Sequence, residues 1–430
     1  MSSNIAAFAS TRATVSINAR KPPYKVLCKP RATQAPLNPA RSHTARLHTA
    51  LGIFRSFHRP RPQFRDTGMN RRHVLIGGGA LALAGGGAAY AGLRQMGSMS
   101  DYEAEIAAAR TVLDEHAGLR EIIRYATLAP NGHNTQPWQF RIDEGGVAIT
   151  PDFTRRTPVV DPDDHHLFVS LGCVGETLAL AACARGHSGT LGFDPHGAVT
   201  FTFGDGPNAE AALFDAIPRR QSTRADYDGR AVSLDDLTLL AGAAAVPGVD
   251  VVLITGRPQM DQVRDLVIAG NTAQMASPEF VREIKSWLRF SPRQAIETGD
   301  GLFSAASGKP PLPPWLGPSM VDWFFNAAAE NDTYARQMRS SSGVAVLVAA
   351  EADPEHWVRA GRACQRFLLQ ATALGLKCAF MNQPVEVAPL RPELAAVAGL
   401  PGRRPDLVIR FGYGPMMPFS ARRPLNTVIV

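Results

Sequence analysis

The period of the apolar positions changes along the chain, and it predicts both helices and strands. In several stretches beyond residue 100, apolar residues recur every three or four positions, which is the spacing of one helical face. In other stretches they alternate with polar residues or form short runs bounded by turn residues, as in strands. The predicted helices are 103–113, 119–128, 167–185, 234–245, 260–273 and 357–374, and the predicted strands are 139–142, 147–150, 190–193, 198–203, 249–255, 342–349, 376–381 and 407–411. The first two strands should form a hairpin, because Glu144-Gly145-Gly146 turns the chain between them.

Two of the predicted helices resemble each other. Leu167–Gly186 and Val358–Gly375 share a pattern of small residues, a pair of leucines, and a closing Gly that leads into a strand. The order of strands and helices around them also recurs. A repeat of this length suggests two similar halves fused into a pseudo-dimer.

The first 68 residues are rich in Ser, Thr, Arg, Pro and Ala, and they hold twelve basic side chains but a single acid, Asp66. Two interpretations of this basic extension, which we expect to be disordered, remain open. It is an organellar transit peptide, or it lies upstream of a true start at Met69. We favour the second, because the next segment resembles an export signal and such a signal works near an N-terminus.

Residues 69–98 resemble a twin-arginine signal. Arg71-Arg72 precedes an uncharged run, 74–93, which ends in the cleavage-like pattern Ala89-Tyr90-Ala91. The alternative is an uncleaved anchor, since about twenty apolar residues can span a bilayer. The high Gly and Ala content of the run favours cleavage. We therefore expect export to the periplasm or cell envelope through the twin-arginine machinery, with anchoring by 74–93 as the alternative.

Charge and cysteine content argue against several classes of protein. The net charge of +7 comes from the first 68 residues, because residues 69–430 hold 33 basic and 37 acidic side chains. A nucleic-acid partner is therefore not expected. Five cysteines without a C-x-x-C pair make a disulfide framework or zinc site unlikely on spacing alone.

Residues 161–166, Asp-Pro-Asp-Asp-His-His, look metal-like at first sight. Neighbouring histidines on a helix point about 100° apart and seldom share a metal. We interpret the cluster as a helix N-cap supplied by Asp163 or Asp164, and we predict no metal site.

The stretch richest in chemistry is Ala129–Trp138, with two prolines, two asparagines, a glutamine and a tryptophan. Gly132 and the asparagines tolerate unusual dihedral angles, and the amides of Asn134 and Gln136 suit a planar heterocycle. The alternative is a tight helix-to-strand turn capped by a core Trp138.

A second stretch places Arg220, Ser222 and Arg224 at alternate positions. An extended backbone would turn all three to one face, where two guanidinium groups and a hydroxyl can hold a phosphate. A solvated basic loop is the alternative. Further on, Gly299–Pro318 is a long segment of Gly, Pro and Ser, which is typical of a lid or of disorder.

Together these motifs resemble the flavin-dependent nitroreductase superfamily, in particular its internally duplicated Acg-type branch, over residues 100–430. Ala129-Pro130 and Asn134-Thr135-Gln136-Pro137-Trp138 are similar to the family's A-P-S-x-x-N-x-Q-P-W loop, with Asn131 where Ser is usual. Arg220-x-Ser222-x-Arg224 resembles its R-x-S-x-R phosphate motif. Leu374-Gly375-Leu376, Gly412-Tyr413-Gly414 and Arg422-Arg423 follow in the family's order.

The resemblance implies an α+β, nitroreductase-like fold of two fused pseudo-symmetric halves, 101–205 and 206–430, with a lid at 299–325. The first half keeps the Asn-rich loop but lacks R-x-S-x-R. The second half keeps R-x-S-x-R, while its corresponding loop near 244–247 lacks Asn, Gln and Trp. These complementary losses predict one FMN site between the halves of a monomeric pseudo-dimer.

The resemblance also implies which residues hold FMN. The phosphate-binding residues are Arg220, Ser222 and Arg224, with Arg422 or Arg423. The residues facing the ring and ribityl chain are Asn131, Gly132, Asn134, Gln136, Asn271, Gln383, Pro384 and Glu386. No catalytic acid or base can be named.

The expected function is an FMN-dependent oxidoreductase that takes hydride from NAD(P)H and passes it to an unidentified acceptor. The flavin carries the redox chemistry, and the protein supplies charge, orientation and a covered pocket. The alternative is a flavin-binding protein with an occluded site and little turnover. The expected partners are a small-molecule substrate or redox donor and the export machinery.

Overall fold

The computed structural model describes residues 26–27, 92, 94–207, 209–324 and 326–430. The extension at 1–68 and most of the signal at 69–98 lie outside these residues, so the predictions made for them concern parts that the structure does not describe. The short strand β1 (Val26–Leu27) pairs in parallel with β6 of the second sheet. Residues 95–430 belong to one unit, which holds the remaining elements.

The first sheet consists of four antiparallel strands in the order β2-β3-β5-β4. They are β2 (Trp138–Asp143), β3 (Gly146–Pro151), β4 (Gly189–Phe193) and β5 (Val199–Phe203). The predicted hairpin is confirmed, with Asp143 opposite Gly146. Gly146 has φ +157°, and a Cβ on it would lie 2.0 Å from the carbonyl oxygen of Phe201, so no side chain fits at this turn.

The second sheet repeats this order with strands from later in the chain. β6 (Val249–Ile254), β9 (Gly343–Ala349), β10 (Lys377–Phe380) and β11 (Leu407–Gly412) are antiparallel in the order β6-β9-β11-β10. Each sheet connects its second and third strands through one long helix, which is α4 (His165–Cys183) in the first and α12 (Pro354–Ala373) in the second. The combination of helices and antiparallel sheets confirms the predicted α+β class.

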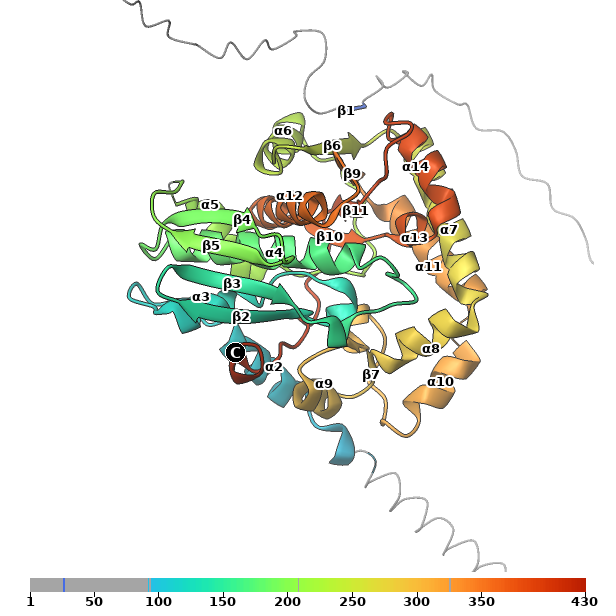
Figure 1. Ribbon diagram of the computed structural model, residues 1–430. Helices are drawn as coiled ribbons and strands as arrows, with labels where there is room; N and C mark the ends of the chain where they lie inside the picture. The colour runs from blue at the N-terminus through green and yellow to red at the C-terminus, as the bar shows by residue number, and fades with distance from the viewer. Residues whose placement is uncertain (1–25, 28–91, 93, 208, 325) are drawn as a thin grey trace, which may run out of the picture. The chain divides into compact units, whose positions relative to one another are not determined.

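The two long helices cross each other in the core (Figure 1). A Cβ on Gly172 of α4 would lie 2.0 Å from the carbonyl oxygen of Val358, and a Cβ on Gly361 of α12 would lie 2.0 Å from that of Val169. The contact is therefore reciprocal, with the same Val-x-x-Gly spacing on both helices. Only glycine at both positions lets the backbones approach so closely.

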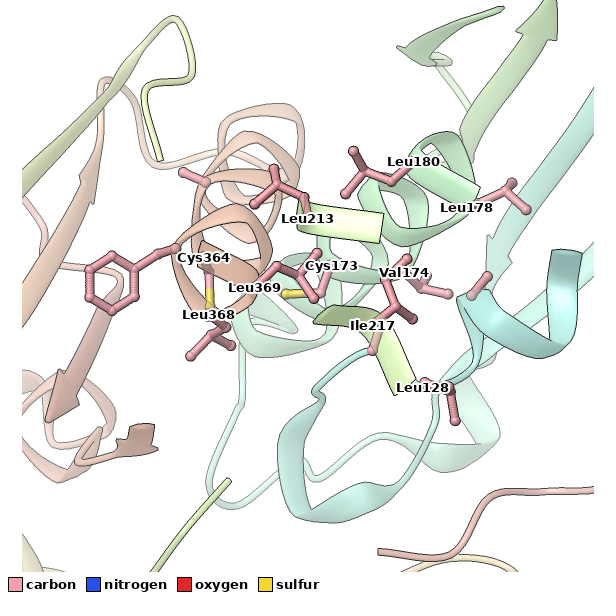
Figure 2. Close-up of a cluster of buried hydrophobic side chains, with 14 of the residues drawn as sticks. Leu128, Cys173, Val174, Leu178, Leu180, Leu213, Ile217, Cys364, Leu368 and Leu369 are labelled. Carbon is pink, nitrogen blue, oxygen red and sulfur yellow. The ribbon is translucent and has the colours of Figure 1, made fainter. Parts of the chain in front are cut away.

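Buried apolar side chains surround the crossing and join the two sheets into one core. Figure 2 shows Cys173 of α4 and Cys364 of α12 close to Leu213 and Ile217. Both cysteines are free and buried, as their positions on apolar helical faces suggested. Among the described helices, α4 alone is long and apolar enough to cross a membrane, and 83% of its apolar window is buried inside the protein, as in a core helix.

The remaining helices cover the sheets and form a large insertion between β6 and β9. They are α2 (Met99–Ala109), α3 (Leu119–Ala126), α5 (Ala211–Ala216), α6 (Leu234–Ala243), α7 (Arg257–Met275), α8 (Pro278–Ser286), α9 (Pro292–Thr298), α10 (Gly317–Phe324), α11 (Ala327–Ser340), α13 (Gln383–Glu386) and α14 (Arg391–Val397). α7 and α14 pack on the face of the second sheet that α12 leaves free. The insertion also contains the short parallel strands β7 (Leu288–Arg289) and β8 (Leu302–Phe303), of which β8 lies inside the segment predicted as a loop.

Two extended segments pair with edges of the two sheets. The C-terminal arm reaches β2 of the first sheet, where the Phe140 amide donates to Val428 at 2.7 Å and the Val430 amide donates to Phe140 at 2.9 Å. Ser222 forms an isolated parallel bridge with Cys378 at the β10 edge of the second sheet. The A-P-N-G-H-N loop, the Arg220–Arg224 segment and the arm therefore meet near the junction of the two sheets.

Candidate functional site

A cavity of about 470 Å³ lies where these segments meet. Its polar lining comes from the loop at 131–133, from Arg224, from Asn271 and Gln274 of α7, and from the α13 region at 382–386. Its apolar lining comes from the insertion, including Phe280, Ile284, Leu288, Leu302, Leu312 and Met320. A cavity of this size, apolar on one side and polar on the other, suits a small organic ligand.

The loop before β2 is bent sharply by three residues other than glycine. His133, Asn134 and Gln136 have φ values of +47°, +56° and +54°. Such left-handed conformations are strained for residues with a side chain, and they persist where the surroundings fix them. Trp138 at the end of the loop is completely buried, which confirms its predicted role in the core.

Asn134 and Gln136 hold neighbouring backbone instead of lining the cavity. The Asn134 amide donates to Gly301 and to Ala421, both at 3.1 Å. The Gln136 amide donates to Gly299 at 2.9 Å and accepts from the Arg423 amide at 2.9 Å. Because the bent backbone turns both side chains away from the cavity, the structure does not support direct contact of either with a ligand there.

Arg422 and Arg423 are similarly engaged outside the cavity. The Arg422 guanidinium donates to the last carbonyls of the α3 segment, Thr127, Leu128 and Ala129, at 2.6–3.2 Å. A helix C-terminus attracts such a cation, because its carbonyl groups have no partner in the helix. Arg423 donates to the Gln136 carbonyl at 3.1 Å. Both arginines thus fasten the C-terminal arm, and their predicted phosphate contacts are corrected accordingly.

The Arg220–Arg224 segment is extended, as predicted. Gln221 faces the arm, where its amide donates to Met417 at 2.7 Å, and the arginines turn the other way. Arg224 lines the cavity, and its guanidinium has no hydrogen-bond or ion-pair partner among the described residues. Arg220 is buried, donates once to Leu128 at 2.9 Å, and keeps its Nε and Nη1 unpaired. Ser222 lies between them without lining the cavity.

Neither of these two arginines forms an ion pair with a carboxylate among the described residues. Burial lowers the pKa of the Arg220 and Arg224 guanidinium groups, and no acidic side chain contributes to either pKa. Unpaired buried cations are costly unless a ligand supplies the opposite charge. The segment can therefore bind an anion, with Arg224 exposed to the cavity and Arg220 behind it.

The opposite wall carries the residues predicted from the second half. Asn271 lines the cavity and donates to Asn331 at 2.7 Å. Glu386 accepts from Gln274 at 2.5 Å, and burial raises the pKa of its carboxyl. Gln383 also lines the cavity, whereas Pro384 is buried behind it in α13 and has no part in the lining.

The cluster at the start of α4 caps the helix, and it also brings ligand atoms of Asp161, His165 and His166 within 4.8 Å of one another. Both carboxylate oxygens of Asp161 accept backbone amides, from His166 and Leu167, at 2.9 Å each. His165 is bonded to Asp406 at 2.8 Å. Asp164 is the N-cap residue, as one of the two predicted candidates, but it makes no side-chain capping bond, which Asp161 supplies instead, and Asp163 pairs with Arg404.

Replacing Asp161 by Asn should lower stability at neutral pH by about 1–2 kcal/mol. Burial alone would raise the pKa of the Asp161 carboxyl, but its hydrogen bonds and the charge of His166 lower it to about 2. A folded-state pKa below the unfolded value of about 3.9 means that the contribution is complete above pH 4 and is lost as the pH falls towards 2.

Urea unfolding of both proteins between pH 7 and pH 3 measures this difference. The gap between them should narrow below pH 4. Asp163→Asn is the matched control, since its exposed pair with Arg404 is worth less than about 1 kcal/mol. A gap that stays constant with pH would show that the Asp161 carboxylate is not the cause.

Sequence reasoning missed several residues that line the cavity. Two of them are the histidines His133 and His166, and Tyr334, Cys173 and Cys364 also contribute. His133 stands inside the loop that the sequence marked, but a single histidine in a loop has no periodic signal. His166 was assigned to the helix cap, and the cap itself directs it towards Asn382, 3.2 Å away.

Comparison with known proteins supports the resemblance. A profile of the nitroreductase family matches residues 217–413, which include Arg220–Arg224 and end at Tyr413. Two proteins of Mycobacterium tuberculosis (strain ATCC 25618 / H37Rv) that are named as NAD(P)H nitroreductases are also similar. Rv3131 is 26% identical over 340 residues, covering 75% of this chain and 94% of that protein. The protein acg is 24% identical over 338 residues, covering 72% and 94%.

Solved structures are similar to about half of the chain. The FMN-dependent nitroreductase NfnB from Mycobacterium smegmatis, in complex with NADPH, is 15% identical and covers 47% of this chain and 88% of its own, with a TM-score of 0.33. A nitroreductase with bound FMN from Desulfitobacterium hafniense DCB-2 is 15% identical, with coverages of 51% and 97% and a TM-score of 0.33.

Proposed function

From the family match over residues 217–413, we propose that the chain is an FMN-dependent oxidoreductase of nitroreductase type. It would take hydride from NAD(P)H and pass it, through the flavin, to a small-molecule acceptor. The relatives named as NAD(P)H nitroreductases support a nicotinamide donor.

The observation that carries the proposal is the composition of the cavity wall. Asn131 and Gly132 come from the first motif, and Arg224 comes from the second, more than ninety residues later in the chain. Two motifs chosen for their resemblance to flavin-binding sequences therefore border one cavity. A tight turn and a solvated loop, the two alternatives, would not require them to meet.

The types of side chain at the cavity are suited to binding FMN. Arg224 offers donors to a phosphate, which has three strong acceptor oxygens, and Arg220 adds a buried, partly unpaired positive charge behind it. Gln383 keeps a buried, unpaired side-chain oxygen that could accept from a ring N–H. When bound, FMN would supply the hydride chemistry. The protein would hold the phosphate, orient the ring and exclude water with the apolar insertion.

We further propose that the chain is an internal pseudo-dimer with a single flavin. The equal strand order of the two sheets supports a duplication, as do the equivalent glycines that follow α4 and α12, Gly186 and Gly375, with φ +79° and +76°. The loop after α6, at 244–248, holds neither Asn nor Gln. It therefore lacks the polar side chains for a second site.

Purified protein should be yellow, contain about one flavin per chain, and lose its visible absorbance when NADPH is added without oxygen. A visible spectrum recorded before and after NADPH is added measures the flavin content and its reduction. The molecular mass in solution should equal that of one chain. Two flavins per chain would contradict the single site. Bound flavin that NADPH leaves oxidised would contradict the reductase with a nicotinamide donor.

The last outcome would favour the second candidate, a flavin-binding protein with little turnover. One observation supports it. Part of the predicted lid, between 302 and 321, lines the cavity, and Lys309 in this segment pairs with Glu330 of α11 at 2.6 Å. A segment fastened in this way would restrict access to one side of the flavin.

Export remains a proposal from the sequence alone. Arg71-Arg72 and the uncharged run at 74–93 support the twin-arginine route, either with cleavage or with anchoring. That route carries folded proteins, which suits a protein that acquires its cofactor before export.

A further inference from the structure

His133 occupies a backbone conformation that glycine would adopt without strain. Its φ of +47° lies in the left-handed region, which costs about 1 kcal/mol or more for a residue with a Cβ. The preceding residue is already a glycine, Gly132. We therefore expect the side chain of His133 to make an interaction that offsets this strain.

The described residues form no hydrogen bond with the His133 side chain. The loop is fixed by other residues, since Asn131 accepts from the Gln136 amide at 2.9 Å and Asn134 is anchored to Gly301 and Ala421. The His133 imidazole forms no hydrogen bond, ion pair or ring contact with the described residues. Its Nδ1 is buried and unpaired, which leaves Nε2 as the nitrogen available to the cavity.

The titratable groups near His133 include both basic and acidic side chains. Arg224 lies on the facing segment, and His166 and Asp161 lie at the start of α4, with Glu386 of α13 beyond His166. Asp161 already accepts two backbone amides and points into the helix. Burial, followed by the charge of Arg224, lowers the pKa of His133 to about 4, so the imidazole is neutral at pH 7.

An imidazole close to an unpaired guanidinium gains no electrostatic stabilisation from it. Both groups are stabilised when an anion binds between them. We propose that His133 and Arg224 together hold the phosphate of the bound cofactor, with Nε2 of the imidazole donating to it. This inference rests on the proposed function and adds to it a residue from the first half. It also explains why the strained loop carries a histidine.

Binding of the phosphate should then be coupled to proton uptake. A dianion near the imidazole raises its pKa, because it stabilises the protonated ring. Between the free and bound pKa values, binding takes up as much as one proton, and affinity rises as the pH falls. Because the pKa of His133 starts from about 4 and an opposite charge raises a pKa by only about 1–3, the uptake is expected below pH 7. The phosphate itself gains a proton near pH 6, so a variant without the imidazole is needed to separate the two contributions.

The test titrates the full chain, freed of flavin, with FMN and with riboflavin, which lacks the phosphate. His133→Gly should bind FMN about tenfold or more weakly than the parent protein and riboflavin equally well. Its unfolding temperature without ligand should be equal or higher, since the strain is removed. Calorimetry at pH 6.5 in two buffers of different ionisation enthalpy should show more proton uptake for the parent protein than for His133→Asn, which keeps only the contribution of the phosphate itself.

Asp164→Gly is the matched control, because Asp164 also has a left-handed φ of +59° but does not line the cavity. It should leave FMN affinity and proton uptake unchanged. The inference is overturned if His133→Gly keeps full FMN affinity, weakens riboflavin equally, or unfolds at a lower temperature. If the parent protein binds no FMN, the proposed function fails with it. Normal binding that is insensitive to His133 contradicts this inference alone.

Discussion

Replacing Arg224 by Ala should weaken FMN binding by about 30-fold or more while leaving the protein folded. Arg224 is the one described arginine that lines the cavity, and its guanidinium has no hydrogen-bond or ion-pair partner among the described residues. Removing one side of a buried, charge-assisted pair costs about 2 kcal/mol or more, which equals about 30-fold in affinity. Purified Arg224→Ala should therefore be nearly colourless where the parent protein is yellow.

The stability of the flavin-free protein distinguishes loss of a ligand contact from loss of the fold. Arg224→Ala removes an unpaired buried charge, so its unfolding temperature without ligand should be unchanged or higher. Arg220→Ala should also lose flavin but become less stable, because Arg220 donates to Leu128 at the end of α3. Arg219→Ala is the control, since Arg219 is exposed and bonds only to the nearby carbonyl of Asp215. A yellow Arg224→Ala protein would refute the phosphate site.

Periodicity located the elements that bury an apolar face and missed those that do not. The helices around 119–128, 167–185 and 357–374 were found because their buried residues recur at helical spacing. α11 was missed for the opposite reason, since Gln337 and Met338 are its only buried residues. Its position is set by capping from Asn326 and by packing on α7, neither of which leaves an apolar stripe in the sequence.

The motifs predicted which segments approach the cavity but not which side chains enter it. Asn134 and Gln136 carry amides suited to a ligand, yet the same amides suit backbone carbonyls equally well. The left-handed dihedral angles turn the amides towards backbone carbonyls instead of a ligand. These angles cannot be predicted from residue types. Arg422 shows the same ambiguity, because a guanidinium fits a phosphate and a helix C-terminus alike. Arg224, Asn131, Gly132, Asn271, Gln383 and Glu386 line the cavity, and their roles towards FMN stay predictions.

Replacing Gly172 by Ala should destabilise the protein by about 3 kcal/mol, the largest loss that we expect from a single methyl group. The added Cβ would lie 2.0 Å from the carbonyl oxygen of Val358 and 2.9 Å from Cα of Gly361. Both atoms belong to the backbone of α12, so no rotation of a side chain can relieve the contact. The helices must separate, and Cys173 and Ser170 of α4, which line the cavity, must move with them.

Chemical unfolding without FMN measures the loss of stability. The additional stability that FMN provides shows how far the movement of the cavity lining affects binding. Gly242→Ala in α6 is the matched control, since a Cβ there has nothing within 4 Å and should raise helix stability by about 1 kcal/mol or less. Gly361→Ala should resemble Gly172→Ala, because the crossing is reciprocal. The double variant should lose less than the sum of the two single losses, since helices already forced apart by one methyl group accommodate the second more easily. Strictly additive losses would mean that the two glycines act separately. In that case α4 and α12 would not share the single close contact on which we expect the cavity to depend.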